Sequence, residues 1–500
     1  MIGNIENITT LGELKKSGYR PIGVKEEIRK NLILALQNNY NPFEQIIGYD
    51  DTVIPDIHTA ILSRHNIVLL GLRGQAKTKI ARLMTNLLDQ LIPIIKGSDL
   101  NDNPFSPLSK YGKELISELG NDTPISWLNR EERYTEKLAT PDVTVADLIG
   151  DIDPIKAASL KLPYSDERVI HFGLIPRSNR GIFVINELPD LQARIQVALF
   201  NILQEKDAQI RGFKIRLPLD IFFIFTANPE DYTNRGSIVT PLKDRIDSQI
   251  LTHYPKSITI SRRITEQEAR NLPEQYEKVR VSELLKDLIE QIAFEARSSD
   301  FVDPKSGVSA RLTISSYENL ISFAERRVLL NHESSTIARI SDLTGVIPSV
   351  TGKIELVYEG EQEGSIKVTN ILIGKAIKSL FINYFPNPDT RKLKTSNQTY
   401  FPITAWFSKG NKLDLFNTCT DKEYESKLTS VPGLKDLVRT QIKNIDKKEE
   451  LLFMEFVLFG LSEFSILSKL PISSGTEFKD MMSTMLNPIG NFQNEDDELV

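Results

Sequence analysis

The stretch HNIVLLGLRGQAKTKIAR, residues 65–82, is the most informative part of the chain. The apolar run Ile67–Leu70 ends at Gly71, and a short loop then leads to Lys77, Thr78 and a helical spacing of apolar residues. A strand, a glycine-containing loop and a helix make a cradle for phosphate, because loop N–H groups and the helix N-terminus face the anion. The lysine reaches the outer phosphates, and the threonine hydroxyl can hold Mg²⁺.

This stretch departs from the pattern G-x-x-x-x-G-K-[ST], because Ala76 stands where a second glycine is expected. If that position requires a positive φ, its Cβ costs on the order of 1 kcal/mol, and Gly74 is an alternative source of flexibility. An ordinary strand, turn and helix with a lysine at the helix start is the alternative interpretation. The residues predicted to bind the nucleotide here are Gly71, Arg73, Gly74, Gln75, Ala76, Lys77 and Thr78.

Composition limits the function classes. The chain has 500 residues, which suggests two to four domains, and a net charge of −6, which gives no general attraction to nucleic acid or anionic membranes. A single cysteine, Cys419, excludes an intrachain disulfide and a cysteine-based zinc site. The N-terminus lacks the apolar core of a signal peptide, and the apolar run Leu451–Leu461 is too short to cross a bilayer. We expect a soluble cytoplasmic protein without membrane insertion.

A second apolar run, Ile182–Ile185, has the composition of a strand buried in a parallel sheet and ends at Asn186 and Glu187. At the carboxyl end of a strand beside a phosphate cradle, the first residue can help hold Mg²⁺ through water. The second, Glu187, can orient and deprotonate the attacking water. The expected pair is Asp-Glu, and Asn186 carries no charge, so we expect weaker Mg²⁺ binding. A turn or helix cap after a strand is the alternative.

Three further polar residues follow in order. Asn228 comes after the buried strand Ile221–Phe225, where it can sense the γ-phosphate or help place the water. Arg245 ends a short helix in TPLKDRID and is a candidate arginine finger supplied to a neighbouring subunit. Arg311 lies at a helix start in GVSARLT, from which it could reach the nucleotide. A turn residue and two solvated charges are the alternatives. Upstream, Ile47 and Gly48 lie in a small apolar turn that could hold a base, although core packing explains the isoleucine equally well.

Outside these motifs the spacing predicts a second strand of the sheet at Leu91–Ile95 and a charged helical piece at Trp127–Lys137. It predicts a hairpin at Ala208–Leu219, strands at Val350–Ser365 and helical structure over residues 402–485. The Pro-, Asn- and Thr-rich segment 385–401 is the best candidate for a domain boundary. The predicted domains are an N-terminal helical segment (1–40), an α/β nucleotide-binding domain (41–258), a helical lid with a small β element (259–390), and a mainly helical extension with an acidic, disordered tail (391–500).

In this order the motifs resemble those of an AAA+ ATPase, and more specifically the branch that contains the MoxR-type ATPases and the magnesium chelatase ATPase subunit. The resemblance covers about residues 25–345. Its motifs are GLRGQAKT (71–78), FGLIPRSNRGIFVINELPDL (172–191), TANPED (226–231), TPLKDRID (240–247) and GVSARLT (307–313). Lys77 and Asn186 are 109 positions apart, whereas one βαβ unit needs only roughly 30 residues, so there is room for the insertion in the second helix that this branch carries.

The resemblance implies an α/β fold, a P-loop core with a parallel sheet flanked by helices, an extra hairpin and a helical lid. It implies that Lys77 and Thr78 bind ATP and Mg²⁺ and that Glu187 is the catalytic base. It makes Asn228 the first sensor, Arg245 a finger acting in trans, and Arg311 the second sensor. Ala76 and Asn186 depart from the family pattern, so hydrolysis is expected to be slow.

Three functions are compatible with these residues. The first is an ATP-driven hexameric ring of MoxR type, a remodelling or maturation chaperone with a von Willebrand factor A partner. The second is a magnesium chelatase ATPase subunit. The third is a nucleotide-bound scaffold that no longer hydrolyses ATP. A role on nucleic acid is not expected, because the chain is acidic and lacks the GAFTGA loop of transcription activators.

Overall fold

The structure is a computed structural model that describes residues 7–164, 166–210, 216–229, 237–388 and 396–481. The chain divides into two compact units, Met1–Tyr254 and Pro255–Val500. This division lies close to residue 258, where the nucleotide-binding domain was predicted to end. Among the described residues, no helix combines the length and the apolar character needed to cross a membrane.

The first unit is built on five parallel strands: β1 (Ile67–Leu70), β4 (Tyr134–Leu138), β7 (Gly181–Asn186), β10 (Ile221–Ala227) and β11 (Ser248–Leu251). Their order across the sheet is β11-β1-β10-β7-β4. After β1 the chain crosses to the far edge, returns through β7 and β10, and then passes to the other side of β1. In such open sheets ligands bind at the carboxyl ends of the strands, where the strand order reverses.

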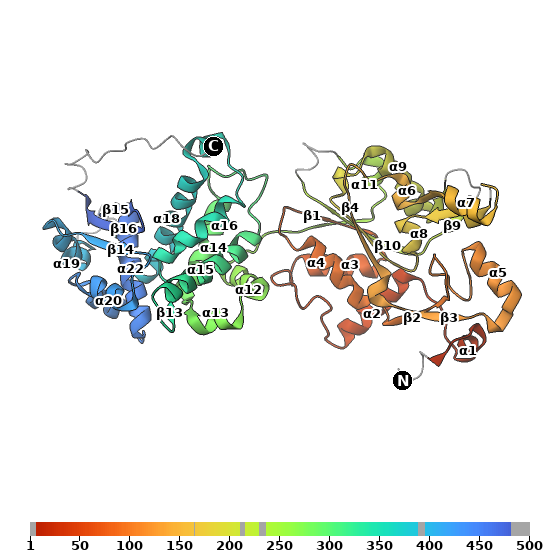
Figure 1. The fold of residues 1–500 in the computed structure, drawn as a ribbon, viewed down its shortest axis with the longest axis horizontal. Helices are drawn as coiled ribbons and strands as arrows, with labels where there is room; N and C mark the ends of the chain where they lie inside the picture. The colour runs from red at the N-terminus through yellow and green to blue at the C-terminus, as the bar shows by residue number, and fades with distance from the viewer. Residues whose placement is uncertain (1–6, 165, 211–215, 230–236, 389–395, 482–500) are drawn as a thin grey trace. The chain divides into compact units, whose positions relative to one another are not determined.

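Helices cover both faces of this sheet (Figure 1). One face carries α2 (Val24–Gln37), α3 (Val53–Leu62) and α4 (Lys77–Leu83), and the other carries α9 (Ala193–Glu205) and α11 (Thr240–Lys243). Alternate residues of β7 therefore belong to different cores: Ile182 and Val184 pack with α2–α4, whereas Phe183 and Ile185 pack with α9. Burial on both faces explains why the central strands are almost wholly apolar.

Leu91–Ile95 forms strand β2, but the prediction that it is the second strand of the main sheet is wrong. It pairs antiparallel with β3 (Ile125–Asn129) in a separate sheet, with α5 (Lys110–Leu119) between them. Pro93 cannot donate a ladder hydrogen bond, which suits a two-stranded sheet better than a central position. The short helix α1 (Leu11–Lys16) lies beside this insertion, since the Leu11 amide donates to the Thr123 carbonyl (2.9 Å).

The prediction of a helix at Trp127–Lys137 is also wrong, because this segment contains the end of β3, a 3₁₀ turn (Arg130–Arg133) and most of β4. Strand β4 is the edge strand of the main sheet, and its side chains are only partly covered. Its sequence, YTEKL, is therefore polar enough to resemble a solvated helix.

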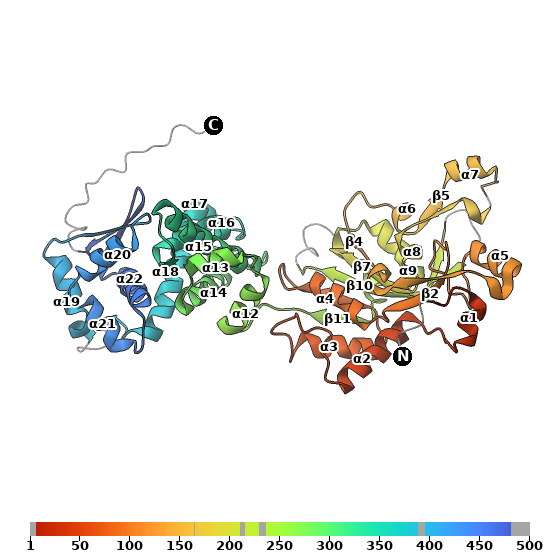
Figure 2. The same cartoon turned by 60° about the horizontal axis from the view of Figure 1, so that its bottom comes forward.

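Two expected features are confirmed: the insertion in the second helix and the hairpin before the strand β10. Between α6 (Val145–Leu148) and α8 (Leu174–Arg177), the hairpin of β5 (Gly150–Ile152) and β6 (Ile170–Phe172) carries α7 (Pro154–Leu160). Figure 2 shows this hairpin projecting from the sheet. Before β10, strands β8 (Asp207–Gln209) and β9 (Arg216–Pro218) pair antiparallel as predicted for Ala208–Leu219, and residues 211–215 lie outside the described residues.

The second unit begins with helices α12 (Ile258–Glu268), α13 (Pro273–Lys278), α14 (Glu283–Arg297) and α15 (Arg311–Leu330). Strands β12 (Val279–Arg280) and β13 (Thr336–Ile337) pair in parallel. The strands predicted at Val350–Ser365 are wrong: the segment holds the end of α16 (Ile347–Thr351) and all of α17 (Tyr358–Glu363), with one isolated bridge between Val302 and Leu356. Helix α18 (Ser365–Tyr384) follows.

The last part of this unit mixes helices and strands. It contains α19 (Ser396–Ser408), α20 (Asp421–Thr429), α21 (Leu434–Gln441) and α22 (Lys447–Glu463). It also contains an antiparallel sheet of β14 (Leu413–Phe416), β16 (Gly475–Asp480) and β15 (Leu467–Ile472) that the helical prediction for 402–485 missed. Buried residues from Val279 to Phe478 form one hydrophobic cluster, with α22 at its centre. The acidic end of the chain lies outside the described residues.

Candidate nucleotide site

The phosphate loop connects β1 to α4, and Gly71 begins it. A Cβ at Gly71 would overlap the Thr252 hydroxyl and the Gln75 side-chain oxygen, so only glycine fits here. Those two groups hydrogen-bond to each other, with Thr252 Oγ1 donating to Gln75 Oε1 (2.7 Å). Strand β11, which Thr252 follows directly, therefore fixes one side of the loop.

Ala76 is the N-cap of α4 and has φ of +58° and ψ of 14°, in the left-handed region. The position therefore does have a positive φ, the case in which its Cβ costs about 1 kcal/mol. Gly74 also has a positive φ, +73°, without that cost. The loop therefore keeps a glycine-type conformation at both positions and accepts strain at one of them.

Two tyrosines hold the loop from outside. Tyr49 donates to the carbonyls of Gln75 (3.1 Å) and His253 (2.7 Å), and Tyr254 donates to the Arg73 carbonyl (3.1 Å). Burial raises the pKa of Tyr49 to about 12, so its hydroxyl stays protonated and remains a donor. Ile47 and Gly48 directly precede Tyr49, and this bond brings their turn to the phosphate loop. The sequence interpretation missed both tyrosines, since neither belongs to a motif.

Asn228 joins the two predicted catalytic segments. The Lys77 ammonium donates to Asn228 Oδ1 (2.6 Å), and Asn228 Nδ2 donates to Glu187 Oε2 (2.7 Å). Lys77 is buried and also donates to the carbonyls of Gly71 and Leu72. Parallel pairing explains this meeting, because Gly71, Glu187 and Asn228 all follow directly on the paired ends of β1, β7 and β10. The structure thus brings together the lysine, the predicted base and the first sensor.

Thr226 and Asn186 form a second link beside the first. The Thr226 hydroxyl donates to Asn186 Oδ1 (3.1 Å) and accepts from the backbone N–H of Glu187 (3.1 Å). Glu187 itself has a left-handed backbone, with φ of +55°, at the end of β7. Such a conformation in a residue other than glycine is held by its surroundings and is typical of functional positions. Thr226 was not among the predicted residues, although it lies two positions before Asn228.

Glu136 of β4 is a further side chain that sequence reasoning missed. Asn186 Nδ2 donates to Glu136 Oε1 (3.2 Å), and Arg82 of α4 donates to both carboxylate oxygens (3.0 Å each). Tyr134 adds a bond to Oε2 (3.0 Å). Burial favours the neutral acid, but the hydrogen bonds from Arg82 and Tyr134 outweigh it and lower the pKa of Glu136. The carboxylate is therefore ionised at neutral pH.

Of the two predicted arginines, Arg245 contacts other residues of the first unit, and Arg311 belongs to the second unit. The Arg245 side chain is held against α9, donating to Gln204 Oε1 (3.0 Å) and to the Pro241 carbonyl (2.7 Å), with its guanidinium 5.0 Å from the centre of the Phe200 ring. Arg311 is exposed at the first position of α15, in the second unit. Arg245 is thus at the surface of its own unit, as an arginine that acts on a neighbouring subunit must be.

Oxygen donors suited to Mg²⁺ gather near the phosphate loop. Thr78 lies half-buried in the first turn of α4. Asn186 is the last residue of β7 and Glu187 follows it, and Glu136 of the adjacent strand β4 accepts a hydrogen bond from Asn186. The described residues contain no group of three or more His, Cys, Asp or Glu side chains that could hold a metal alone. This donor set fits Mg²⁺, which proteins bind through one or two oxygen ligands together with substrate phosphates.

No protein-family model matches the chain. The magnesium-chelatase 38 kDa subunit of Cereibacter sphaeroides is 26% identical to it over 221 residues, 43% of this chain and 60% of that protein. The same subunit of Rhodobacter capsulatus is 25% identical over 221 residues, 43% of this chain and 57% of that protein. A magnesium-chelatase subunit ChlI homolog of Methanocaldococcus jannaschii is 24% identical over 234 residues, 45% of this chain and 59% of that protein. The chain spans less than two thirds of the length of each relative.

Solved structures also align with the chain. A complex of the magnesium chelatase subunits BchI and BchD aligns with a TM-score of 0.33 and 19% identity, over 64% of this chain and 98% of that chain. NtrX from Brucella abortus aligns with a TM-score of 0.32 and 13% identity, over 52% of this chain and 47% of that chain. Scores this low add nothing to the assignment. The strand order and the phosphate loop match an AAA+ fold, and the sequence relatives are consistent with the branch that contains the MoxR-type ATPases and the magnesium chelatase ATPase subunits.

Proposed function

We propose that the protein binds and hydrolyses ATP and works as a ring-forming motor. The observation that carries this proposal is the bridge from Lys77 through Asn228 to Glu187. In this bridge the Lys77 ammonium is the cation for the outer phosphates and the Glu187 carboxylate is the base. The Asn228 side-chain amide lies between them and hydrogen-bonds both. A buried strand end with only a capping role would not need these three groups in contact.

Each residue has a defined part in the proposed reaction. The loop N–H groups and Lys77 bind the phosphates, and Glu187 takes a proton from the attacking water while Asn228 keeps the carboxylate in place. Mg²⁺ on Thr78 and the phosphates would offset the charge that develops there. Asn186 carries no charge of its own and Ala76 strains the loop, so we expect turnover at the slow end for such enzymes.

A ring is part of the proposal, because the described contacts of Arg245 are with Gln204, Pro241 and Phe200 and not with the bridge from Lys77 to Glu187. Arg245 lies two residues after α11, packs against α9, and would complete the site of the next subunit. Arg311 would act as the second sensor on the lid. The proposed assembly is a hexamer, and a partner with a von Willebrand factor A domain is proposed from the family resemblance.

A magnesium chelatase ATPase subunit is the second candidate, and the three sequence relatives favour it. The described C-terminal part, α19 to β16, packs into the same core as the lid and carries no motif that distinguishes the two roles. The two candidates differ in the partner they need. Both require hydrolysis, whereas the scaffold alternative does not.

The experiment is to measure ATP binding and solution mass together. The full chain with Glu187→Gln should bind ATP and assemble into a ring that persists, because bound ATP is not consumed. Lys77→Ala should bind ATP at least tenfold more weakly and stay at the mass seen without nucleotide. A Glu187→Gln protein that binds no ATP, or whose mass is the same with and without ATP, would contradict the proposed ring motor.

A further inference from the structure

Position 186 lacks a negative charge that would attract Mg²⁺, yet the carboxyl group of Glu136 lies next to it. Glu136 pairs with Val184 across β4 and β7, and Asn186 is two residues further along the same face of β7. The Asn186 amide therefore reaches Glu136 Oε1 at 3.2 Å. The carboxylate belongs to the neighbouring strand, one hydrogen bond away from the residue that is expected to carry it.

The surroundings of Glu136 place it on the same side as the phosphate loop. Arg82, which binds it through two hydrogen bonds, is four residues after Thr78 on α4, so the two side chains lie on one face of that helix. The Arg82 side chain is 64% exposed and the Glu136 side chain 25% exposed. Arg82 therefore binds the Glu136 carboxylate on its solvent-facing side, and Asn186 binds it on the side that faces the predicted nucleotide site.

We propose that Glu136, acting through Asn186, is the positioning residue that supplies the negative charge at the Mg²⁺–nucleotide site. This inference rests on the proposed nucleotide site and extends it to a residue outside every motif. It also assigns Asn186 a definite role: its amide hydrogen-bonds a carboxylate, which a second carboxylate could not do. An aspartate at position 186 would set two negative charges within hydrogen-bond distance of each other.

The first test needs neither metal nor nucleotide. Thermal unfolding of the full chain is compared for the wild type, Asn186→Asp, Glu136→Gln and the double variant. Asn186→Asp should lower the midpoint, because it opposes Glu136, and adding Glu136→Gln should recover most of the loss. Midpoint changes that simply add would overturn the inference, because they would mean that the two side chains do not interact.

The second test measures Mg²⁺ affinity with a fluorescent ATP analogue. Glu136→Gln should weaken the Mg²⁺-dependent part of binding about tenfold or more, as expected for a group that acts through a metal ligand, and leave binding in EDTA unchanged. The double variant, which moves the carboxylate to position 186, should return to within about threefold of the wild type. Glu131→Gln, which removes another arginine-paired carboxylate from the turn directly before β4, is the matched control and should match the wild type.

The outcomes separate this inference from the proposed function. Wild-type protein that binds no nucleotide would overturn both together. Wild-type binding with Mg²⁺ affinity unchanged in Glu136→Gln would overturn the inference alone. Equal loss in Glu136→Gln and the double variant would also overturn it, because moving the charge to position 186 would then restore nothing.

Discussion

Each unit of the protein contains a polar network, and the two networks are built differently. The edge network of the first unit lies at and near the carboxyl edge of the parallel sheet and consists of Lys77, Glu136, Asn186, Glu187, Thr226 and Asn228. The core cluster of the second unit consists of Arg327, Arg339, Asp342, Asp421, Tyr424 and Glu455. The first borders a loop with the chemistry of an anion site, whereas the second is enclosed by the hydrophobic core.

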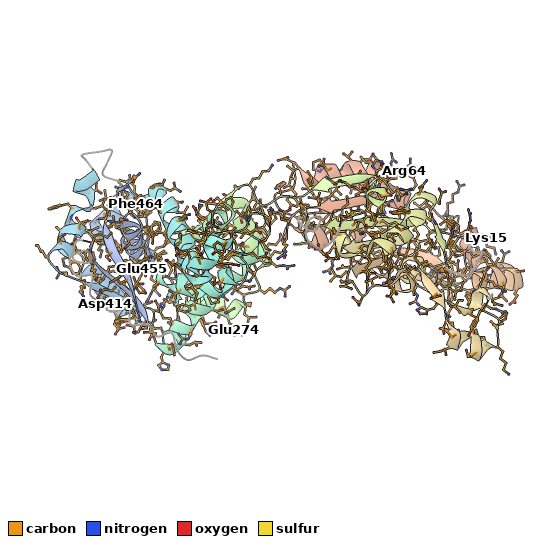
Figure 3. The ribbon with its side chains drawn as sticks, turned by 90° about the horizontal axis from the view of Figure 1, so that it is seen from above. Lys15, Arg64, Glu274, Asp414, Glu455 and Phe464 are labelled. Carbon is orange, nitrogen blue, oxygen red and sulfur yellow. The ribbon has the colours of Figure 1, made fainter. Side chains whose placement is uncertain are left out.

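The core cluster links segments that are distant in sequence. Arg327 of α15 pairs with Asp342 (2.8 Å), and both side chains are at most 1% exposed. Arg339 pairs with Asp421 at the start of α20 (2.7 Å). Glu455 of α22, labelled in Figure 3, accepts bonds from the Ile340 amide (2.7 Å) and the Tyr424 hydroxyl (2.8 Å). These contacts join the lid helices to the C-terminal part of the chain.

The two networks are expected to have different roles, catalysis for the edge network and stability for the core cluster. Groups in the edge network are joined by individual side-chain hydrogen bonds and lie beside the phosphate loop. Charges in the core cluster are paired inside the protein, and removal of one leaves its partner buried without compensation. Changes in the edge network should therefore alter catalysis, and changes in the core cluster should alter stability.

The largest effect is expected from Arg245→Ala, which should lower ATP turnover roughly a thousandfold or more and leave ATP binding unchanged. Lys243→Ala, at the end of α11 two residues before Arg245, is the control. Mixing sharpens the test: Arg245→Ala subunits keep Glu187, and Glu187→Gln subunits keep Arg245, so a mixture should regain turnover that neither has alone. A mixture as inactive as its components would mean that Arg245 does not act between subunits.

Next in size is Arg327→Met, which should destabilise the second unit by about 3–5 kcal/mol, because Asp342 loses its buried partner. Chemical denaturation of the full chain measures the change. The neighbouring Arg326→Met is a matched control, since Arg326 is exposed on the same helix and should change stability by less than about 0.5 kcal/mol. Equal stability of the two variants would contradict the claim that the core cluster stabilises the second unit.

A pH effect is expected from Glu290 of α14, where burial raises the pKa from 4.5 to about 7 despite hydrogen bonds from Ser261 and Thr265. The folded state keeps this proton between about pH 4.5 and 7 while the unfolded state loses it, so the contribution to stability falls as pH rises through that window. Glu290→Gln should match the wild type near pH 5 and exceed it by at most roughly 3 kcal/mol at pH 8. A stability difference that does not change with pH would contradict the assignment.

The smallest effect concerns Ala76, whose φ is +58°. Ala76→Gly should raise the stability of the first unit by roughly 0.5–1 kcal/mol, because glycine adopts this conformation without strain. Ala193→Gly, at the exposed first position of α9, serves as the control and should not raise it. A loss of stability in Ala76→Gly would mean that the Cβ is held by contacts that outweigh the strain.

Sequence reasoning found the parts of the site that depend on chain order. Lys77, Glu187 and Asn228 each follow a buried apolar strand, and parallel pairing then brings them to one edge of the sheet. The positive φ at Ala76 could be anticipated for a similar reason, because the loop pattern itself calls for glycine. The strand that precedes each residue and the loop pattern around Ala76 can both be read from short stretches of sequence.

Residues that act from a sheet edge or from outside the motifs could not be found in this way. Glu136 was interpreted as part of a helix, because a half-covered edge strand alternates too weakly to show its period. Tyr49 and Tyr254 touch the phosphate loop only through its carbonyl groups, which no motif records. The core cluster has no local signal, since its members are spread over 128 positions, from Arg327 to Glu455, and only the packed core brings them together.

The central claim is that the edge network hydrolyses ATP. Its most direct test is steady-state phosphate release with ATP and Mg²⁺ from the full chain, compared with Glu187→Gln and with Glu131→Gln as a control. We predict measurable turnover in the wild type and the control, and a loss of at least a hundredfold in Glu187→Gln. Turnover that survives Glu187→Gln would contradict the claim, and so would a wild-type protein that binds ATP but releases no phosphate.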